Sequence, residues 1–249
     1  MKGRQKLEAL VLARRNSGEA DQLVTFFTRE HGLVRALAKG VRKIPSRRGG
    51  HLEPFTFVLT LLTTSRAGSY VGAVETLDHL GELKAEAASL RIASHIAATI
   101  MGLFEEGDVQ AELFDAFFEA CRMLPMLDEA KAHLLEATLM SFALTRAGLK
   151  PDLTACRQCG VRQPAESIVL DAYQGGWRCL LCHGGFSGTR YSLSPTLLKV
   201  LRFIQTNPSQ ALRVRLPQDQ AAQMIAGVRA YVAAVTQQPM LSEAAAFSS

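Results

Sequence analysis

Four cysteines in two close pairs constrain the fold of this 249-residue chain more than any other feature. They form Cys-x2-Cys, a 19-residue spacer and a second Cys-x2-Cys, at Cys156, Cys159, Cys179 and Cys182. Two residues between thiolates let one backbone turn present both sulfurs to a tetrahedral ion, and two such turns complete a four-sulfur site. We therefore expect one structural Zn²⁺, because four protein ligands leave no open position for catalysis.

The residues around these cysteines agree with a small metal-binding module. The spacer predicts a short hairpin, with Ile168–Leu170 before a turn over Tyr173–Trp177. A Cys-x-x-Cys redox pair would need a thioredoxin-like βαβ context, which the sequence lacks. His183 is interpreted as a bystander beside the second pair, and Cys121 as a buried core thiol. An odd number of cysteines with two close pairs indicates metal ligation in a reducing compartment and not a disulfide framework.

Residues 1–80 carry the alternating, β-branched patterns of strands. The expected strands are Leu7–Leu12, Ala20–Thr28, Leu33–Lys39, Phe55–Thr64 and Tyr70–Leu77. Five strands with short turns and one long loop, residues 40–50, fit a small closed barrel of the oligonucleotide-binding (OB) type, which leaves no open sheet edge. An SH3-like barrel would have a similar strand count, so the barrel class is better defined than its topology.

From Gly81 the pattern becomes helical, which makes the fold class α+β. The expected helices are Glu82–Phe104, Asp108 (as N-cap) to about Met123, Asp128 (as N-cap) to Gly148, Ser194-Pro195 to Ile204, and Gln218–Thr236. We expect three parts: an OB-type barrel in 1–80, a helical domain in 81–150 and 190–249, and a four-cysteine zinc module in 151–189 inserted into the helical domain. The helical phenylalanines are expected in the core.

Basic residues are concentrated near the N-terminus. Residues 1–50 hold twelve Lys or Arg and four Asp or Glu, a formal charge of +8, so that with +5 for the whole chain the remainder carries −3. Arg29–Gly50 alone has seven cations against one acid, Glu30, in a basic strand followed by a loop rich in Gly and Pro. This indicates a polyanionic partner for the N-terminal module. A solvated loop whose charges only aid solubility is the simpler alternative.

Other sequence signals are weak or absent. No stretch approaches the 18 or so apolar residues of a membrane span, and the apolar run Leu7–Ala13 is interrupted by Glu8, unlike a signal peptide. The sequence contains no basic amphipathic helix that could lie on an anionic membrane surface. No Walker A, GxGxxG, HExxH or GxSxG motif is present, and the six histidines form no evident cluster with acids. We therefore expect a cytoplasmic protein that is not an enzyme.

Three stretches of the N-terminal module resemble the signature of the bacterial RecO recombination-repair proteins, of the zinc-containing type. They are Gly18–Gly32, Ala38–Lys43 and Arg47–Phe55. The resemblance extends over the chain as a barrel, a helical domain and a four-cysteine module. Some members of the family lack the cysteines, which implies that the metal site is a scaffold.

The resemblance implies a DNA repair and recombination mediator of the RecF pathway. Such a protein binds single- and double-stranded DNA and anneals complementary strands. With RecR, it helps to load RecA onto single strands coated by the single-strand binding protein. It implies a cytoplasmic, nucleoid-associated bacterial protein whose helical domain carries partner contacts.

Annealing needs no nucleophile, only cations that neutralise the phosphates of two strands. The residues expected to contact phosphates are Arg14, Arg15, Arg35, Lys39, Arg42, Lys43, Arg47 and Arg48. Residues 14–18 are expected to form the first barrel loop. Adjacent strand residues face opposite ways, so at least one of Phe26 and Phe27 is expected in the core. With few exposed aromatics expected in the barrel, binding should depend on charge and salt and only weakly on sequence.

Two other classes of function stay open from the residues alone. In the first, the four-cysteine segment is itself a transcription or protein-interaction module of the zinc-ribbon kind. In the second, the chain is an enzyme stabilised by a metal, and its cationic loop covers a small anionic substrate. The second lacks a candidate base near the loop except His31 and His51.

Overall fold

The structure is a computed structural model that describes residues 3–41, 49–182 and 191–237. The described residues form two compact units. The barrel unit takes those in Met1–Ala97 and Phe104–Pro125, and the cysteine unit takes those in Ala98–Leu103 and Met126–Ala246. This is a different division from the three parts expected from the sequence, which stay a prediction.

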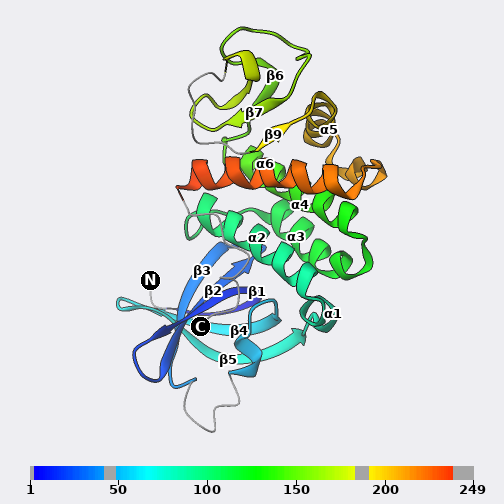
Figure 1. The fold of residues 1–249 in the computed structure, drawn as a ribbon. Helices are drawn as coiled ribbons and strands as arrows, with labels where there is room; N and C mark the ends of the chain where they lie inside the picture. The colour runs from blue at the N-terminus through cyan, green and yellow to red at the C-terminus, as the bar shows by residue number, and fades with distance from the viewer. Residues whose placement is uncertain (1–2, 42–48, 183–190, 238–249) are drawn as a thin grey trace. The chain divides into compact units, whose positions relative to one another are not determined.

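A closed five-stranded barrel forms the centre of the barrel unit (Figure 1). Its strands are β1 (Gly3–Ser17), β2 (Asp21–Thr28), β3 (Gly32–Ala38), β4 (Phe57–Ser65) and β5 (Gly68–Asp78), in the order β1-β2-β3-β5-β4. The long β1 pairs with both β2 and β4, and β3 meets β5 in parallel. This closed five-stranded arrangement is OB-like, so the predicted OB-type barrel is confirmed.

Period-two alternation decides which side chains fill the barrel. Its interior is apolar and includes Ala9, Val11, Val24, Phe26, Ala36, Ala38, Val58 and Val71. The residues between them on β2 and β3 therefore point outward, and several of these, such as Leu23, Arg35 and Leu37, are exposed or only half-buried.

The prediction of a loop at residues 14–18 is wrong for all of them but Gly18, because β1 continues to Ser17. Arg14 pairs with Val24 and Arg15 with Leu23, and the register shifts between Val11 and Ala13. The turn comes only at Gly18, where φ is +72°. The strand continues through polar residues because backbone hydrogen bonds to β2 hold it in place, and these bonds do not require an apolar pattern.

Three helices belong wholly or partly to the barrel unit: α1 (Gly81–Ala85), α2 (Ala87–Leu103, whose last turn and a half lie in the cysteine unit) and α3 (Ala111–Met123). Helix α3 packs on the outside of the barrel. The rings of Phe27 and Phe114 are 5.4 Å apart, and those of Phe57 and Phe118 are 4.5 Å apart. Short 3-10 turns lie at Gly50–Leu52 and Leu124–Met126.

Two predictions about these helices are wrong. The expected helix Glu82–Phe104 is interrupted at Glu86, whose backbone is extended and whose carboxylate accepts from the N–H groups of Ala88 and Ser89, so it caps α2. Asp108 does not cap α3, because Gln110 holds that position; the Asp108 carboxylate instead accepts from the N–H of Glu105.

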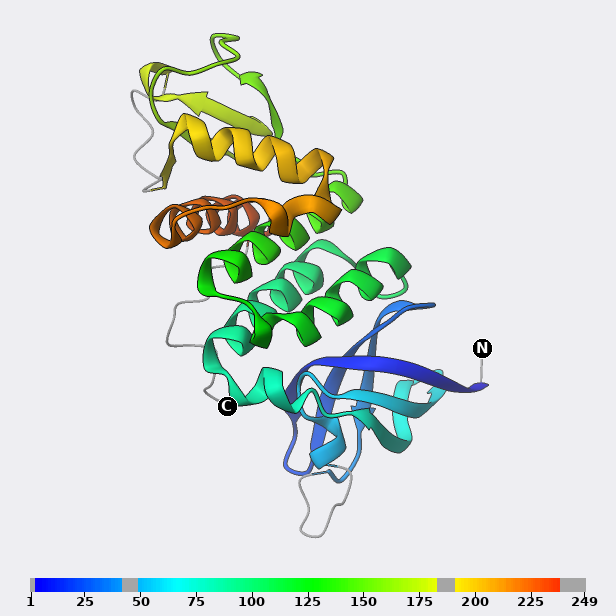
Figure 2. The same ribbon diagram turned by 90° about the vertical axis from the view of Figure 1, so that its right-hand side faces the viewer.

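The cysteine unit combines helices with a small sheet. Its helices are α4 (Glu129–Arg146), α5 (Pro195–Thr206) and α6 (Gln218–Thr236), with 3-10 turns at Leu180–Cys182 and Pro208–Arg213. Figure 2 shows α6 lying along α4, with α5 on its other side. Asp128 and Ser194 cap α4 and α5 as predicted, accepting from the N–H groups of Lys131 and Leu197.

The sheet of this unit has the order β6-β8-β7-β9. The strands are β6 (Asp152–Cys156), β7 (Ile168–Asp171), β8 (Gly176–Cys179) and β9 (Ser192–Leu193). Strands β7 and β8 form the predicted hairpin, and Trp177 on β8 is fully buried in the core shared with α4, α5 and α6. In the described parts of the chain, no helix is long and apolar enough to cross a membrane.

Candidate nucleic-acid interface and metal centre

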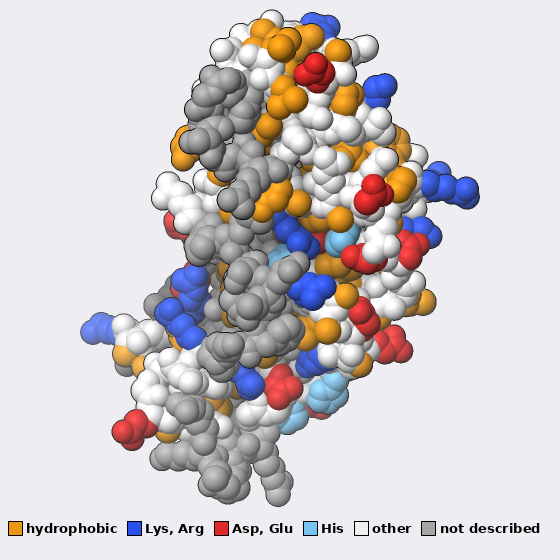
Figure 3. Space-filling model, viewed as in Figure 1, with side chains coloured by type: hydrophobic (Ala, Val, Ile, Leu, Met, Phe, Trp, Pro, Cys, Tyr) orange, Lys and Arg blue, Asp and Glu red, His pale blue; other side chains and the backbone are white. Residues whose placement is uncertain are grey.

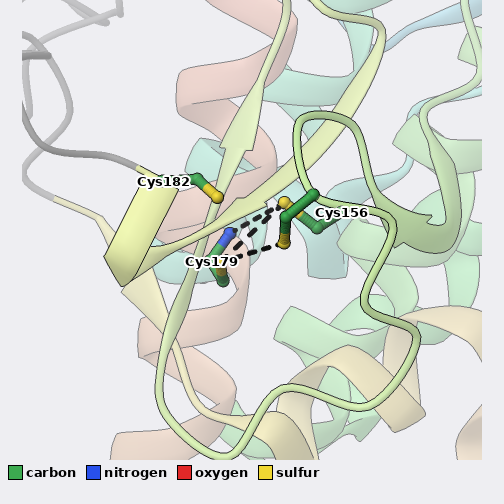
Figure 4. A group of neighbouring side chains, drawn as sticks. Cys156, Cys179 and Cys182 are labelled. Carbon is green, nitrogen blue, oxygen red and sulfur yellow. Dashed lines mark hydrogen bonds between the residues drawn. The ribbon is translucent and has the colours of Figure 1, made fainter.

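The four predicted cysteines come together at one end of the small sheet. Figure 4 shows three of them, Cys156, Cys179 and Cys182. Their sulfurs all lie within 4.8 Å of one another. The Sγ of Cys179 is 3.9 Å from that of Cys156 and 3.7 Å from that of Cys159. Four bonds of about 2.3 Å to a tetrahedral zinc place sulfurs about 3.8 Å apart, so the arrangement fits this ion.

Local sequence explains how each pair presents its sulfurs. Cys156 ends β6, and a tight turn follows in which the N–H of Gly160 donates to the Cys156 carbonyl over 2.9 Å. Gly160 has φ of +76°, a backbone conformation that glycine adopts without strain. Cys179 ends β8, and the 3-10 turn Leu180–Cys182 brings the last sulfur back to the others.

The electrostatics of the site favour a bound cation. Burial raises the pKa of Cys156, but backbone N–H groups of Cys159, Cys179 and Gln158 outweigh it and lower the pKa to about 6. The pKa of Cys182 is raised to about 12, chiefly because it donates hydrogen bonds to Cys179 and Cys159. Backbone dipoles thus stabilise the first thiolate, and further negative charge among neighbouring sulfurs needs a metal ion to balance it.

Around the cysteines, contacts of largely buried side chains link β8 to β6 and to β7. The indole N–H of Trp177 donates to the Leu153 carbonyl over 3.1 Å. Arg178 pairs with Asp171 over 2.7 Å, and both side chains are largely buried. Four thiolates that surround one ion leave it no position for substrate, so the structure favours a structural role.

A second candidate site is the outer face of the barrel, where residues from four strands form one row. Arg15 pairs with Leu23, Leu23 with Leu37, and Leu37 with Tyr70. Paired residues of neighbouring strands point to the same side. Arg15 is exposed, and Leu23, Leu37 and Tyr70 are half-buried. The row is therefore an apolar floor with a cation at one end; we call it the barrel face.

Two further cations border the barrel face. Arg35 pairs with Thr25 in the adjacent row, and its guanidinium is 3.9 Å from Glu106, with both side chains about half exposed. The ammonium of Lys39 stands 4.6 Å from the centre of the Tyr70 ring. A weak, exposed ion pair leaves most of the charge of Arg35 available to an anion.

The structure thus brings three of the eight expected phosphate contacts together: Arg15, Arg35 and Lys39. Arg14 is separated from these three cations. It lies on the same side of the sheet as its partner Val24, which is in the barrel interior, and its guanidinium donates to the Gly49 carbonyl at 3.4 Å. The other four, Arg42, Lys43, Arg47 and Arg48, lie outside the described residues. Figure 3 shows Lys and Arg side chains on the surface of the barrel unit.

Sequence reasoning missed the position of Tyr70. It placed the residue in a strand but could not show that the ring lies beside Lys39, because that contact depends on closure of the barrel between β3 and β5. Phe26 and Phe27 are both fully buried, so neither can stack on a base.

Comparison with known proteins covers nearly the whole chain. The family described as "Recombination protein O N terminal" matches residues 1–79, and "Recombination protein O C terminal" matches residues 86–243.

Two bacterial relatives are similar over most of their length. A protein of Anaeromyxobacter dehalogenans named "DNA repair protein RecO" is 34% identical over 205 residues, 80% of this chain and 78% of the relative. One of Thermobifida fusca with the same name is 34% identical over 183 residues, 70% of this chain and 72% of the relative. The barrel, the cysteine cluster and these matches agree: the chain belongs to the RecO family of DNA repair proteins.

Proposed function

We propose that the barrel face binds DNA through its cations, and that the protein anneals complementary strands and acts with RecR to load RecA onto single strands coated by the single-strand binding protein. The placement of Arg15, Arg35 and Lys39 on one face, over strands that close into an OB-like barrel, carries the DNA-binding part. Phosphates that these residues neutralise release counterions, so affinity falls as salt rises.

Annealing follows from the same charge. Residues 1–50 carry a formal charge of +8, enough to screen two strands at once, and joining bases by hydrogen bonds requires no catalytic group on the protein. We propose that the protein is not an enzyme and that it works in the cytoplasm on nucleoid DNA. The four cysteines are proposed to hold one Zn²⁺ that stabilises the cysteine unit, and the helices are proposed to carry the contacts with partner proteins.

The test measures binding of labelled single- and double-stranded DNA across a salt series. The first variant is Arg15→Gln/Arg35→Gln/Lys39→Gln, and the second removes the four cations at 42, 43, 47 and 48. A control that removes the same charge from the cysteine unit is Arg146→Gln/Lys150→Gln/Arg162→Gln; all three residues are exposed.

The proposal expects the first variant to bind both DNAs more weakly, with the slope of log affinity against log salt flatter by about 2 to 3. The control should bind nearly as wild type does. If the control loses as much as the first variant, only net charge matters. If the first variant binds as wild type does, DNA binds elsewhere on the chain.

A further inference from the structure

Tyr70 is an aromatic residue that the barrel does not need for its core. Its neighbour Val71 is buried in the barrel interior, so Tyr70 points outward, where its ring is half-buried. The barrel's other outward rings, Phe27 and Phe57, pack against phenylalanines of α3. Tyr70 instead lies beside the Leu37 backbone and the Lys39 ammonium.

The surroundings of this ring combine an apolar floor with cations. Leu37 lies next to it in the row and Leu23 follows on the far side of Leu37, while Arg15, Arg35 and Lys39 border this floor. The row crosses four strands, about 14 Å at the usual spacing between strands. Rings and aliphatic side chains bordered by cations are what single-stranded nucleic acid requires, since its bases stack on apolar surface while its phosphates need positive charge.

We propose that Tyr70 stacks on an unpaired base, and that this contact gives the barrel face a preference for single-stranded over double-stranded DNA; the proposal rests on the DNA-binding function above. A duplex keeps the faces of its bases inside its own stack, where no side chain reaches them without unpairing. A cation–π contact at an exposed site is weak. A base therefore replaces the Lys39 ammonium over the ring, and the ammonium moves to a neighbouring phosphate.

The experiment separates base from backbone with three probes of equal length: labelled oligo-dT, the same strand made abasic, and a duplex. Each is titrated against wild type, Tyr70→Leu, Tyr70→Phe and Tyr173→Leu. Leucine keeps apolar bulk without a ring, and phenylalanine keeps the ring without the hydroxyl. Tyr173 is a matched control, since it is an exposed tyrosine in the cysteine unit, 85% accessible.

Tyr70→Leu should lose about 5- to 20-fold in affinity for oligo-dT, within the range measured for single stacked bases. It should bind the abasic strand and the duplex as wild type does, with an unchanged salt slope. Tyr70→Phe should stay within about 2-fold of wild type on all probes, because the stacking surface remains. Tyr173→Leu should match wild type throughout.

Three outcomes overturn the proposal. Equal losses of Tyr70→Leu on all three probes mean that the residue supports the fold of the face and does not stack. Unchanged binding of Tyr70→Leu to oligo-dT means that the ring takes no part, while the DNA-binding function stands. If wild type itself binds no probe in a salt-dependent way, the proposed function fails, and this inference fails with it.

Tryptophan fluorescence gives a second test of whether the residue at position 70 stacks on a base. In Tyr70→Trp, the new indole joins a single native tryptophan, Trp177, which is fully buried. Stacking predicts that oligo-dT quenches the emission of this variant, and that the abasic strand at saturation does not. Quenching by both strands would contradict stacking.

Discussion

Arg229 on α6 and Glu136 on α4 form a bidentate ion pair in which the Glu136 carboxylate is fully buried. Nε of the arginine lies 2.7 Å from Oε1, and Nη2 lies 2.7 Å from Oε2. The glutamate side chain is 0% exposed and the arginine side chain 24%. The pair therefore fixes the position of α6 along α4, and the carboxylate depends on the arginine to offset the loss of water.

Replacing Arg229 with methionine should destabilise the cysteine unit strongly. The change leaves the Glu136 carboxylate buried without its cation, and breaking a buried pair in this way costs about 3–5 kcal/mol. Urea unfolding followed by circular dichroism measures the loss as a lower midpoint at unchanged slope.

Two comparisons make this result specific. The double change Glu136→Leu/Arg229→Met removes both charges and should recover most of the lost stability. Arg157→Met breaks an exposed pair with Asp152, at 44% and 39% exposure, and should cost about 1 kcal/mol or less. If Arg229→Met costs no more than Arg157→Met, the buried pair does not hold the helices together.

Gly32→Ala should be among the most damaging single changes in the barrel unit. Gly32 has φ of +62°, and a Cβ there would lie 1.9 Å from the backbone oxygen of Asp108. Strain and a backbone clash together should cost at least about 3 kcal/mol, measured by thermal or urea unfolding.

Gly18→Ala separates the two effects. Gly18 has φ of +72°, but a Cβ added at this position would have no atom of the other described residues within 4 Å, its two chain neighbours aside. The change should cost only the backbone strain, about 1–2 kcal/mol. Equal losses at the two glycines would show that the contact with Asp108 does not constrain the turn between β2 and β3.

The parts of the molecule that the sequence predicted best depend on neighbours in the chain. Each Cys-x2-Cys pair is a local turn, so the cluster of four cysteines could be predicted residue by residue. Asp128 and Ser194 cap helices through N–H groups three residues on, and both predictions are confirmed. The strand count also followed from alternation within each segment.

What could not be predicted depends on pairing between distant strands. The row Arg15, Leu23, Leu37 and Tyr70 exists only because of the registers of β1, β2, β3 and β5. The sequence treated Arg14 and Arg15 as equivalent, but the alternation of the extended β1 places them on opposite sides. The break at Glu86 could not be seen in the sequence, because glutamate favours helix and this one lies in a continuous Ala- and Glu-rich run. Its carboxylate instead accepts hydrogen bonds from the backbone and caps α2.

Cys179→Ser should remove the metal and destabilise the cysteine unit while DNA binding persists. The sulfur of Cys179 lies 3.7 and 3.9 Å from those of Cys159 and Cys156, and a structural zinc contributes directly to folding free energy. Mass spectrometry for metals should find about one zinc per wild-type chain and much less in the variant. Thermal unfolding of the variant should begin at a lower temperature, and salt-dependent DNA binding should stay near that of wild type.

Cys121→Ala is the control, because Cys121 is buried in α3 of the barrel unit and the cluster belongs to the cysteine unit. It should keep the zinc. If Cys179→Ser retains zinc, the four thiolates are not its ligands. If the variant keeps its barrel folded but loses DNA binding, the cysteine unit is itself the binding module.

Asp78→Asn should lower stability at neutral pH by an amount that shrinks in acid. Partial burial raises the pKa of Asp78, but the N–H of Leu80 and the guanidinium of Arg122 outweigh it and hold the pKa below its usual value. The carboxylate accepts from these groups at 2.9 and 3.0 Å. A lowered native pKa stabilises the fold above the unfolded pKa, about 3.9, and that contribution is lost as pH falls through the native pKa.

The difference in unfolding free energy between wild type and Asp78→Asn should be about 1–2 kcal/mol from pH 7 to pH 5, because the amide accepts more weakly than a carboxylate. It should decline below about pH 4. Urea unfolding at pH 7, 5, 4 and 3.5 measures it, and the carboxyl carbon shift of Asp78 reports the native titration midpoint directly. The expectation is contradicted if the difference stays constant down to pH 3.5 and the native titration midpoint of Asp78 is at or above about 3.9. Neither hydrogen bond would then stabilise the Asp78 carboxylate, which links the end of β5 to α3.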